Sequence, residues 1–266
     1  MGEELPYVRA DVFDYPERPR VTVRRRAFVT GGTSPMGQAI VRRFARAGHE
    51  VAFSYNSNGE RAKELAAETG TEAYALDFRR EWRAPDLDVD ILVNNAGVNL
   101  ATEEIFNTSD EEIETTMRIN FYAPVRLIRH YGRGMRDRGF GRVVTINSGM
   151  GLVPPARRLS YGASKHAMRA ATRSLAQELA AYQITVNDVC PGPVDSFMFR
   201  EKAQAAVDAG RFPDTGAYLA DFLSRVPTGS LILADEVAAA VAFLAAEESG
   251  SITGVALRVD GGMYNL

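Results

Sequence analysis

Seven short apolar runs, separated by longer amphipathic stretches, are the feature that most restricts what this chain can fold into. Most of the runs do not alternate apolar with polar side chains, a pattern typical of strands that are covered on both faces. The stretches between them can form helical crossovers, so we expect one α/β Rossmann domain with a doubly wound, seven-stranded parallel sheet and helices on both faces. The predicted strands are 27–29, 51–53, 73–76, 91–93, 143–146, 184–186 and 255–257.

Three segments stand apart from this pattern. Residues 1–22 contain three prolines and show no helical or strand period, so we interpret them as an extension before a domain that occupies 23–266. Residues from about 197 to 230 form an insertion rich in aromatic side chains, which suits a lid over an apolar substrate, although packing on the domain body would need the same residues. The connection 78–90 is too short for more than one or two helical turns.

The composition excludes several classes of protein. The 266 residues include 31 basic and 34 acidic side chains, which offer no excess positive field to nucleic acid or an anionic membrane. One cysteine, Cys190, cannot form an internal disulfide or a multi-cysteine metal site. No apolar stretch has membrane-spanning length, and the N-terminus has no signal-peptide pattern. We therefore expect a cytoplasmic protein with no metal, no membrane contact and no nucleic-acid partner.

Two long segments carry strong helix signals. Residues 109–112 read Ser-Asp-Glu-Glu, a capping box in which Ser109 accepts from the third amide and Glu112 reaches back, so a helix should run from about 110 to about 135. A second helix should cover about 161–182, with alanine around most of its circumference. Both have more apolar surface than one sheet face can cover, which favours a subunit interface; a helix simply crowded with alanine is the alternative.

A glycine-containing loop follows the first predicted strand directly. Residues 30–37 read Thr-Gly-Gly-Thr-Ser-Pro-Met-Gly and open an amphipathic helix. In a doubly wound fold this is where backbone amides and a helix N-terminus receive a pyrophosphate. Gly31 can adopt a positive φ, and Gly37 permits close packing of helix on strand. Alone, the loop could equally be an ordinary strand-to-helix turn.

Four polar residues carry the predicted chemistry. Tyr161 and Lys165 are one helical turn apart, so both project into one crevice, and the ammonium should lower the phenol pKa from about 10. Proton exchange then becomes feasible near neutral pH. Ser148 can donate a hydrogen bond to a carbonyl oxygen that gains negative charge, and Asn120 can hold a water that links Lys165 to solvent. Each residue alone could have an ordinary structural role. A lysine four residues after Tyr161 is nevertheless specific evidence for this chemistry, because the chain has only three lysines.

These motifs resemble those of the short-chain dehydrogenase/reductase family over residues 26–266. The family loop reads Thr-Gly-x-x-x-Gly/Ala-x-Gly, and this chain departs from it at Pro35, which stands at the middle glycine. Residues 94–97, Asn-Asn-Ala-Gly, end the fourth predicted strand, and a Pro-Gly turn at 191–192 follows the sixth. The C-terminal part, 226–264, is most similar to the branch of 3-oxoacyl-(acyl-carrier-protein) reductases.

The resemblance implies a nicotinamide cofactor and residues that hold it. An acidic side chain at the end of the second strand would bind the ribose of NAD and repel a 2′-phosphate, but Tyr55 and Asn56 stand there, so we expect NADPH in preference to NADH. Arg61, Arg79 or Arg80 could clamp the phosphate. The predicted cofactor-binding residues are Gly31, Thr33, Ser34, Met36, Gly37, Tyr55, Asn56, Asp77, Phe78, Asn95, Ala96, Gly97, Tyr161, Lys165, Pro191, Gly192, Val194 and Ser196.

Two of these assignments carry specific expectations. Because Pro35 lacks an N–H, Thr33, Ser34 and the Met36 amide should do more of the phosphate binding, while proline at the first helical position should preserve the backbone. Asp77 resembles the family's adenine-contacting aspartate, and capping of the short connection is its alternative role.

The predicted activity is NADPH-dependent reduction of a ketone to a secondary alcohol, with Asn120, Ser148, Tyr161 and Lys165 as catalytic residues. The small-molecule carbonyl substrate would be a 3-oxoacyl thioester, on CoA or a carrier protein, or an intermediate of specialised metabolism. Two alternatives stay open. One is an NAD(P)-dependent alcohol dehydrogenase that works oxidatively, and the other is a catalytically inactive, cofactor-sensing regulatory protein.

Two further expectations concern partners. A basic cluster, which we place near the site entrance, could meet an acidic carrier protein, and solvated charges at a helix end are the alternative. Its members are Arg133, Arg136, Arg138 and Arg142. Resemblance to the family implies that a second interface, through the last strand and 237–244, completes a homotetramer with 222 symmetry.

Overall fold

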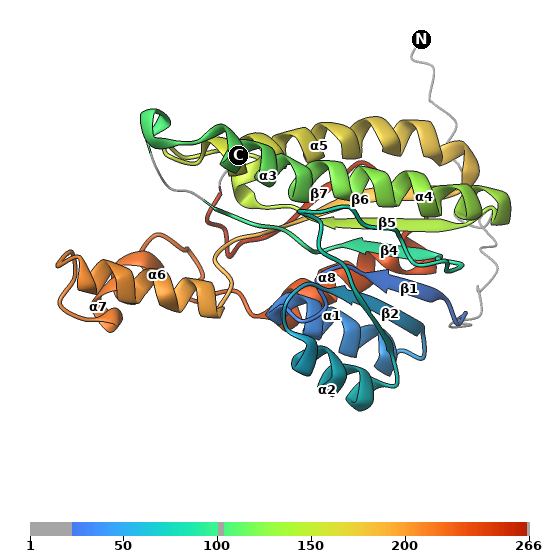
Figure 1. Ribbon diagram of the computed structural model, residues 1–266, viewed down its shortest axis with the longest axis horizontal. Coiled ribbons are helices and arrows are strands. Elements are labelled where there is room, and N and C mark those ends of the chain that lie inside the picture. Colours follow the sequence, from blue (N-terminus) through green and yellow to red (C-terminus); the bar gives the residue numbers. More distant parts are fainter. Residues whose placement is uncertain (1–22, 101–103, 265–266) are drawn as a thin grey trace, which may run out of the picture.

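The sheet predicted from the apolar runs is present. The computed structural model describes residues 23–100 and 104–264, so the predicted extension 1–22 lies outside the described residues. Within them, seven strands pair in parallel in the order β3-β2-β1-β4-β5-β6-β7 (Figure 1). The strands are β1 (Arg26–Val29), β2 (Glu50–Tyr55), β3 (Glu72–Ala75), β4 (Ile91–Asn94), β5 (Gly141–Ile146), β6 (Ile184–Pro191) and β7 (Ala256–Val259). The order reverses between β1 and β4, where a crevice opens at the carboxyl ends of the strands.

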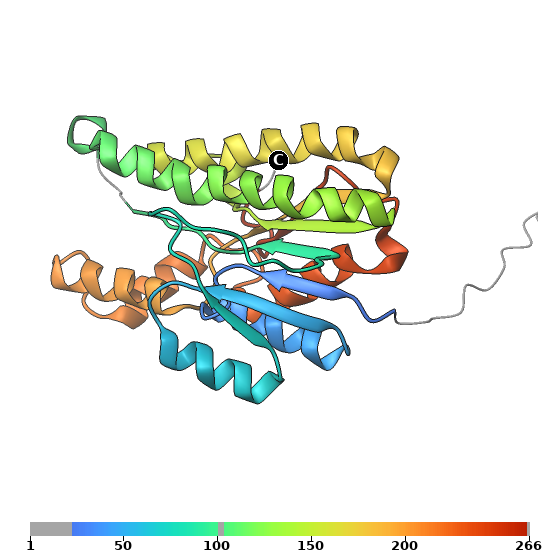
Figure 2. The same cartoon turned by 45° about the vertical axis from the view of Figure 1, so that its right-hand side comes forward.

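Helices cover both faces of this sheet (Figures 1 and 2). The α-helices of the described residues are α1 (Pro35–Arg46), α2 (Gly59–Thr69), α3 (Asp110–Met117), α4 (Ala123–Arg138), α5 (Leu159–Leu179), α6 (Phe197–Asp208), α7 (Thr215–Leu223) and α8 (Ala234–Ala245), of which α6 and α7 do not lie on the sheet. Along β1, Ala27 and Val29 face a core closed by α1, α2 and α8, while Phe28 faces a second core closed by α4 and α5. Successive side chains of a strand point to opposite faces, so the doubly wound fold is confirmed.

The first long helix is interrupted in the middle. A π-helical turn, η3 (Arg118–Tyr122), separates α3 from α4. Pro124 explains the interruption, because proline cannot donate to the carbonyl four residues back, that of Asn120, and its ring presses on that carbonyl. The amide of Ala123 instead donates to a carbonyl five residues back. Asn120 therefore lies in a widened turn rather than in the regular helix expected from the sequence.

The start of this helix departs in part from the predicted capping box. The Ser109 hydroxyl accepts from the Glu112 amide at 3.2 Å, as predicted. The Glu112 carboxylate does not reach back; it accepts a hydrogen bond from the Ser160 hydroxyl at 3.0 Å. This contact ties α3 to the first turn of α5.

Helix α5 begins two residues before its predicted start and continues into one 3-10 turn, η5 (Ala180–Tyr182). The short connection 78–90 contains no helix, in agreement with its length, and the Asp77 carboxylate accepts from the Arg79 amide there at 3.0 Å. In the part of the chain that the structure describes, no helix is both long and apolar enough to cross a membrane.

Helices α6 and α7 form an arm that projects from the body of the domain (Figures 1 and 2). Four aromatic rings pack together within it, with centroids between 5.0 and 6.2 Å apart: those of Phe199, Phe212, Tyr218 and Phe222. Aromatic pairs at such separations add stability beyond the burial of their area. The arm therefore carries a small core of its own.

Candidate active site

The glycine loop and the end of β4 form one hydrogen-bonded unit. The Thr30 hydroxyl accepts from the amides of Asn95 (3.0 Å) and Ala96 (2.9 Å). The Asn95 side-chain amide donates back to the carbonyls of Thr30 (2.8 Å) and Gly31 (3.0 Å). Gly31 has a φ of +65°, as predicted. A side-chain carbon on Gly37 would collide with the Gly31 carbonyl, so the helix packs closely at Gly37 as predicted, although on the loop after β1 and not on the strand itself.

Pro35 preserves the backbone of the loop. It is the first residue of α1, as predicted, and Ser34 is the N-cap. The Ser34 hydroxyl accepts from the Gly37 amide (3.1 Å) and the Asn95 side chain (3.2 Å). It also donates to the Gly31 carbonyl (3.0 Å). A hydroxyl has one proton and two lone pairs, so this one is fully engaged in shaping the loop.

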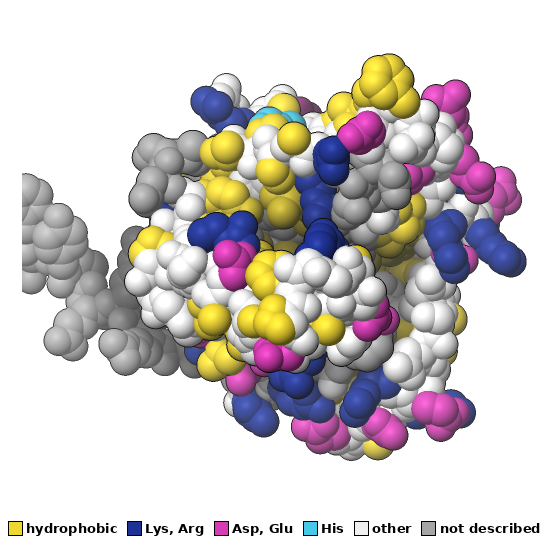
Figure 3. Space-filling view, turned by 90° about the vertical axis from the view of Figure 1, so that its left-hand side faces the viewer, with side chains coloured by type: hydrophobic (Ala, Val, Ile, Leu, Met, Phe, Trp, Pro, Cys, Tyr) yellow, Lys and Arg dark blue, Asp and Glu magenta, His cyan; other side chains and the backbone are white. Residues whose placement is uncertain are grey.

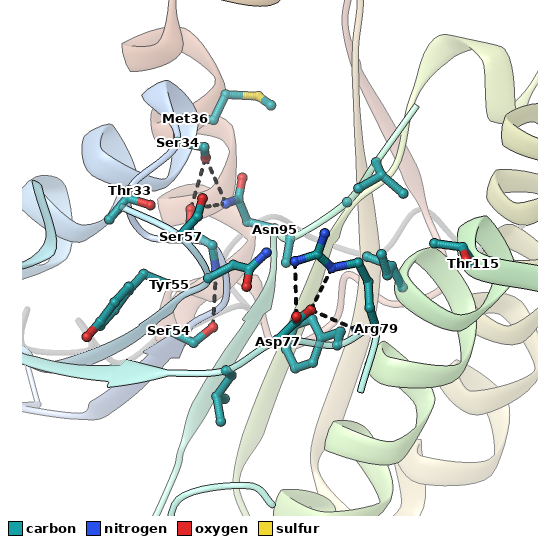
Figure 4. A pocket seen from close by; sticks show the side chains of 18 of the residues that line it. Thr33, Ser34, Met36, Ser54, Tyr55, Ser57, Asp77, Arg79, Asn95 and Thr115 are labelled. Carbon is teal, nitrogen blue, oxygen red and sulfur yellow. Dashed lines mark hydrogen bonds and ion pairs between the residues drawn. The ribbon is translucent and has the colours of Figure 1, made fainter. Parts of the chain in front are cut away.

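A cavity of about 320 Å³ lies against this unit (Figure 4). Many of the predicted cofactor residues line it: Gly31, Thr33, Ser34, Met36, Tyr55, Asn56, Asp77, Phe78, Asn95, Ala96 and Gly97. The wall also includes Thr115 of α3 and Ile119 of η3, which the sequence analysis missed. No local signal marks them, because only tertiary packing brings α3 beside the end of β4.

The arginines considered as phosphate clamps are paired with carboxylates. Arg79 holds Asp77 through two hydrogen bonds of 2.9 and 3.0 Å (Figure 4), and Arg80 approaches the same carboxylate at 3.6 Å. Arg61 pairs with Glu64 at 3.3 Å. The hydrogen bond from Arg79 is the main cause that lowers the pKa of Asp77. Asp77 thus lines the cavity and caps the short connection at the same time.

Ser148, Tyr161 and Lys165 converge beyond the carboxyl end of β5. Ser148 caps the 3-10 turn η4 (Gly149–Gly151), and Tyr161 and Lys165 lie in the first two turns of α5. Lys165 is 5% exposed, and its Nζ donates to the Ile146 carbonyl at 2.8 Å. The same Nζ lies 5.6 Å from the centre of the Tyr161 ring, and Tyr161 is hydrogen-bonded to Ser148.

Asn120 is anchored on two sides. Its Oδ1 accepts from the Val98 amide (2.9 Å), and its Nδ2 donates to the Val98 carbonyl (2.8 Å) and the Ser164 hydroxyl (3.0 Å). That hydroxyl in turn donates to the Tyr161 carbonyl at 2.8 Å. The widened turn at Asn120 is therefore linked through Ser164 to the helical turn that carries Tyr161.

Burial reverses the expected effect on Tyr161. Desolvation raises the pKa of Tyr161 above 10, and the hydrogen bond with Ser148 opposes this rise. Burial also lowers the pKa of Lys165 to about 8. The prediction that Lys165 draws the phenol pKa below its usual value is thus wrong for the protein alone, because both groups lose solvent and the ammonium is aimed at the Ile146 carbonyl.

The remaining predicted cofactor residues follow β6 at the same edge of the sheet. Pro191 ends the strand, and a side-chain carbon on Gly192 would lie 2.9 Å from the Asp260 Cα. Val194 forms an isolated bridge with a residue before α8, and the Ser196 hydroxyl caps α6. Some predicted residues do not line the cavity: Gly37, Tyr161, Lys165, Pro191, Gly192, Val194 and Ser196. The site therefore has a cofactor end around the cavity and a catalytic end around Tyr161.

The basic cluster does not lie near the site entrance. Arg142 is at the amino end of β5, six residues before Ser148, which along a strand is about 20 Å. Arg142 is buried, and its guanidinium donates to the Gly141 carbonyl (2.9 Å). Arg138 pairs with Asp88 and Asp90, both at 3.1 Å. The prediction is wrong because a strand separates the end of α4 from the catalytic edge.

Tyr264 is a neighbour of the site that sequence reasoning did not select. A side-chain carbon on Gly149 would collide with the Tyr264 ring, so the ring lies directly on the turn after Ser148. Burial and the nearby Tyr161 raise the pKa of Tyr264. More than a hundred residues separate the two tyrosines in the chain, so only the fold reveals this contact.

Comparison with known proteins agrees with this geometry. A family model described as enoyl-(acyl carrier protein) reductase matches residues 31–264. The acetoacetyl-CoA reductase of Rhizobium meliloti (strain 1021) is 34% identical over 250 residues, which are 90% of this chain and 98% of that protein. The 3-oxoacyl-(acyl-carrier-protein) reductase FabG of Escherichia coli (strain K12) is 35% identical over 248 residues, 90% of this chain and 96% of that protein.

A solved structure is similar over the whole domain. The actinorhodin polyketide ketoreductase, crystallised as a variant with NADPH, matches with a TM-score of 0.83 at 30% identity, over 92% of this chain and 99% of that one. The chain therefore belongs to the short-chain dehydrogenase/reductase family of oxidoreductases, in the branch of the 3-oxoacyl-(acyl-carrier-protein) reductases.

Proposed function

We propose that this protein catalyses the NADPH-dependent reduction of a ketone to a secondary alcohol. The observation that carries the proposal is the convergence of Ser148, Tyr161 and Lys165 at the same sheet edge as the glycine-loop cavity. The residues fit a nicotinamide cofactor. Gly97 lies between the cofactor end and the catalytic end of the site. A side-chain carbon there would come within 3.2 Å of Asn120 Oδ1 and 3.7 Å of Lys165 Nζ, so the absence of a side chain leaves space between the two ends.

The chain's own residues would handle the charge and the proton. NADPH supplies the hydride when it is bound. Tyr161 gives its phenolic proton to the carbonyl oxygen of the substrate, and Ser148 donates a second hydrogen bond to that oxygen. The Lys165 ammonium, 5.6 Å from the centre of the ring, would offset the negative charge of the phenolate once it forms. Asn120, held by Val98, fixes the turn of α5 that presents Tyr161 through its bond to Ser164.

The cavity supports NADPH over NADH. At the end of β2 its wall is formed by neutral side chains, those of Ser54, Tyr55, Asn56 and Ser57. The one carboxylate among the lining residues, that of Asp77, is paired with Arg79 and Arg80. A 2′-phosphate would therefore meet no unpaired negative charge there.

For the substrate, we propose a 3-oxoacyl thioester or a related pathway intermediate. The named relatives reduce acetoacetyl-CoA and 3-oxoacyl-(acyl-carrier-protein). The face that carries the arm is hollowed, with hydrophobic side chains in the hollow and Lys or Arg side chains at its rim (Figure 3). Such a surface suits an acyl chain with an anionic carrier group. We propose that the insertion 197–230 closes over this chain as a lid, with Tyr264 on the opposite wall.

We further propose a cytoplasmic homotetramer. Large apolar side chains are exposed on both helical layers, including Tyr122 of η3 and Phe243 of α8. Paired helices from two copies would cover such surfaces in a symmetric interface. Light scattering should give a mass near four times 29.1 kDa. A monomer at micromolar concentration would contradict this assembly.

The activity itself can be tested directly. The protein is titrated with NADPH and with NADH, followed by nicotinamide fluorescence, and is then assayed with a panel of ketones that includes short 3-oxoacyl-CoA thioesters. We expect tighter binding of NADPH and its oxidation in the presence of a thioester. Failure to bind either nucleotide would reject the oxidoreductase assignment. Binding without turnover on any ketone or alcohol would favour the cofactor-sensing alternative.

A further inference from the structure

Asp188 is a buried carboxylate that the proposed mechanism does not use. It lies in β6 and has no exposed surface. Three side chains contact its oxygens: the Thr172 hydroxyl (2.8 Å), the Asn147 side-chain amide (3.3 Å) and the Arg169 guanidinium (3.4 Å). A buried charge is costly unless it is hydrogen-bonded and paired, so these partners are needed to hold it.

Asn147 connects this carboxylate to the catalytic end. Its Nδ2 donates both to Asp188 and to the backbone carbonyl of Lys165, the latter at 3.2 Å. Its backbone amide donates to the Val189 carbonyl at 2.7 Å, and Ser148 is the next residue. One side chain therefore ties the strand end that carries Ser148 to the helical turn that carries Lys165.

The packing around this junction leaves no spare room. A side-chain carbon on Gly151, in the turn after Ser148, would lie 3.0 Å from the Lys165 Cβ and would collide with the Asn147 amide. Interiors packed this closely transmit small displacements instead of absorbing them. A shift of Asn147 would thus reach both Ser148 and Lys165.

Few charges face the Lys165 ammonium. Its hydrogen bond goes to a neutral carbonyl. The ionisable groups that act on it are Asp188 and Cys190 of β6 and the neighbouring Tyr161, while Arg169 of α5 faces Asp188. Burial lowers the pKa of Lys165 to about 8, and the Asp188 carboxylate opposes this. Burial raises the pKa of Asp188 to about 6, so it is still charged at neutral pH.

We propose that Asp188 is a positioning residue for the reductase reaction: its carboxylate holds the Asn147 amide against α5 and provides the counter-charge of the Lys165 ammonium. The proposal rests on the function proposed above for Ser148, Tyr161 and Lys165. It adds to that function a residue that touches neither substrate nor cofactor.

The charge of Lys165 can be measured without any assay of activity. The chain has three lysines, so protein grown with isotope-labelled lysine gives three side-chain signals in NMR, and Lys165→Arg assigns the one that titrates near pH 8. Asp188→Asn should lower the Lys165 pKa by about one pH unit, because it removes the counter-charge. Arg169→Leu breaks the ion pair of Asp188 but leaves its carboxyl group, whose pKa should rise. Because the carboxylate keeps part of its charge, this variant should lower the Lys165 pKa less than Asp188→Asn does. An unchanged Lys165 pKa in folded Asp188→Asn would overturn the proposal.

The kinetic test uses the same pair of variants with a third as control. Asp188→Asn should lower kcat about tenfold, with KM for NADPH little changed, because the catalytic groups lose their alignment. The alkaline limb of its pH profile should move to lower pH, since Lys165 loses its proton earlier. Asn187→Ser is the control. Asn187 precedes Asp188 in β6 and is also buried, but its side chain is hydrogen-bonded to the backbone of Ile252 and Val255, so this variant should leave kcat and the pH profile unchanged. Equal losses in Asp188→Asn, Arg169→Leu and Asn187→Ser would show a merely structural role.

If Asp188→Asn does not fold, a double variant that removes both charges of the Asp188–Arg169 pair can replace it. Asp188→Val combined with Arg169→Leu replaces the pair by apolar side chains, a change that buried ion pairs often tolerate. It should still lower the Lys165 pKa, and no change would reject the counter-charge. If the unmodified protein lacks reductase activity, the proposed function fails while the NMR result stands separately.

Discussion

The two ends of the active site are built in different ways. At the cofactor end, eight consecutive residues shape the loop through the backbone: Gly31 takes a positive φ, Gly37 has no room for a side chain, and Ser34 caps the helix. At the catalytic end, side chains from distant elements meet in buried surroundings, with Lys165 and Asp188 both enclosed. Local backbone geometry sets the first end, and long-range packing of polar groups sets the second.

This difference predicts which kinds of substitution should impair each end of the active site. The backbone of the loop 30–37 cannot move aside for an added carbon, so NADPH binding at the cofactor end should respond to changes in the size and charge of side chains there. A constellation of buried polar groups responds instead to the loss of a single proton or hydrogen bond. Substitutions at one end should therefore leave the other largely intact, and four predictions test this separation.

The largest effect should come from Tyr161→Phe. The change removes the proton donor but keeps the ring, so kcat should fall by about 100-fold or more. NADPH affinity, measured by fluorescence titration, should change less than about twofold because the glycine loop is untouched. A variant that keeps most of its activity on the true substrate would show that another residue is the acid.

Gly37→Ala should break the cofactor end. Its new carbon would meet the Gly31 carbonyl, which is backbone and cannot move aside, so NADPH affinity should fall about tenfold and stability by about 1–3 kcal/mol. Gly132→Ala is the matched control, because a carbon there meets nothing within 4 Å, and it should stabilise α4 by about 0.5–1 kcal/mol. Denaturant unfolding compares the two variants. Equal stability would mean that the loop packs less tightly than described.

Tyr55→Asp should add a negative charge to the cofactor end. A carboxylate beside the 2′-phosphate should weaken NADPH binding about tenfold and reverse the preference toward NADH. Tyr55→Asn removes the ring without adding charge and should keep the preference for NADPH. Steady-state rates with each nucleotide measure both variants. Equal use of NADH by the unmodified protein would refute the argument.

The smallest effect should come from Ser34→Ala. The Gly37 amide loses its cap, which should cost about 1 kcal/mol of stability in denaturant unfolding. NADPH affinity should change only slightly, because the Ser34 hydroxyl is engaged within the loop. A large loss of affinity at unchanged stability would mean that this hydroxyl binds phosphate instead.

Local patterns made much of the fold and of the cofactor end predictable. The apolar runs correspond to the strands, and the loop at 30–37 has the expected positive φ, close packing and proline-led helix. The length of the connection 78–90 limited its predicted helix to one or two turns at most, and the structure has none there. These features depend on neighbours within a few residues, so the sequence contains nearly all the relevant information.

Two of the errors have the opposite cause, because they depend on groups that only the fold places. The basic cluster was placed near the site because the length of β5 between it and Ser148 was ignored, and the effect of Lys165 on Tyr161 was judged without the desolvation of both groups. Pro124 stands in the printed sequence, and the widened turn at Asn120 could have been inferred from it. The contact of Tyr264 with Gly149 had no local signal at all.

The sequence by itself determined the strand pattern, the shape of the glycine loop and the set of residue types at the catalytic end. Those properties follow from periodicity, from the steric limits of glycine and proline, and from the chemistry of single side chains. Only the tertiary structure decided which groups lose solvent and which meet: the burial of Lys165, the enclosure of Asp188 and the link through Asn147. Electrostatic strength depends on distance and on exclusion of water, and neither quantity exists until the chain has folded.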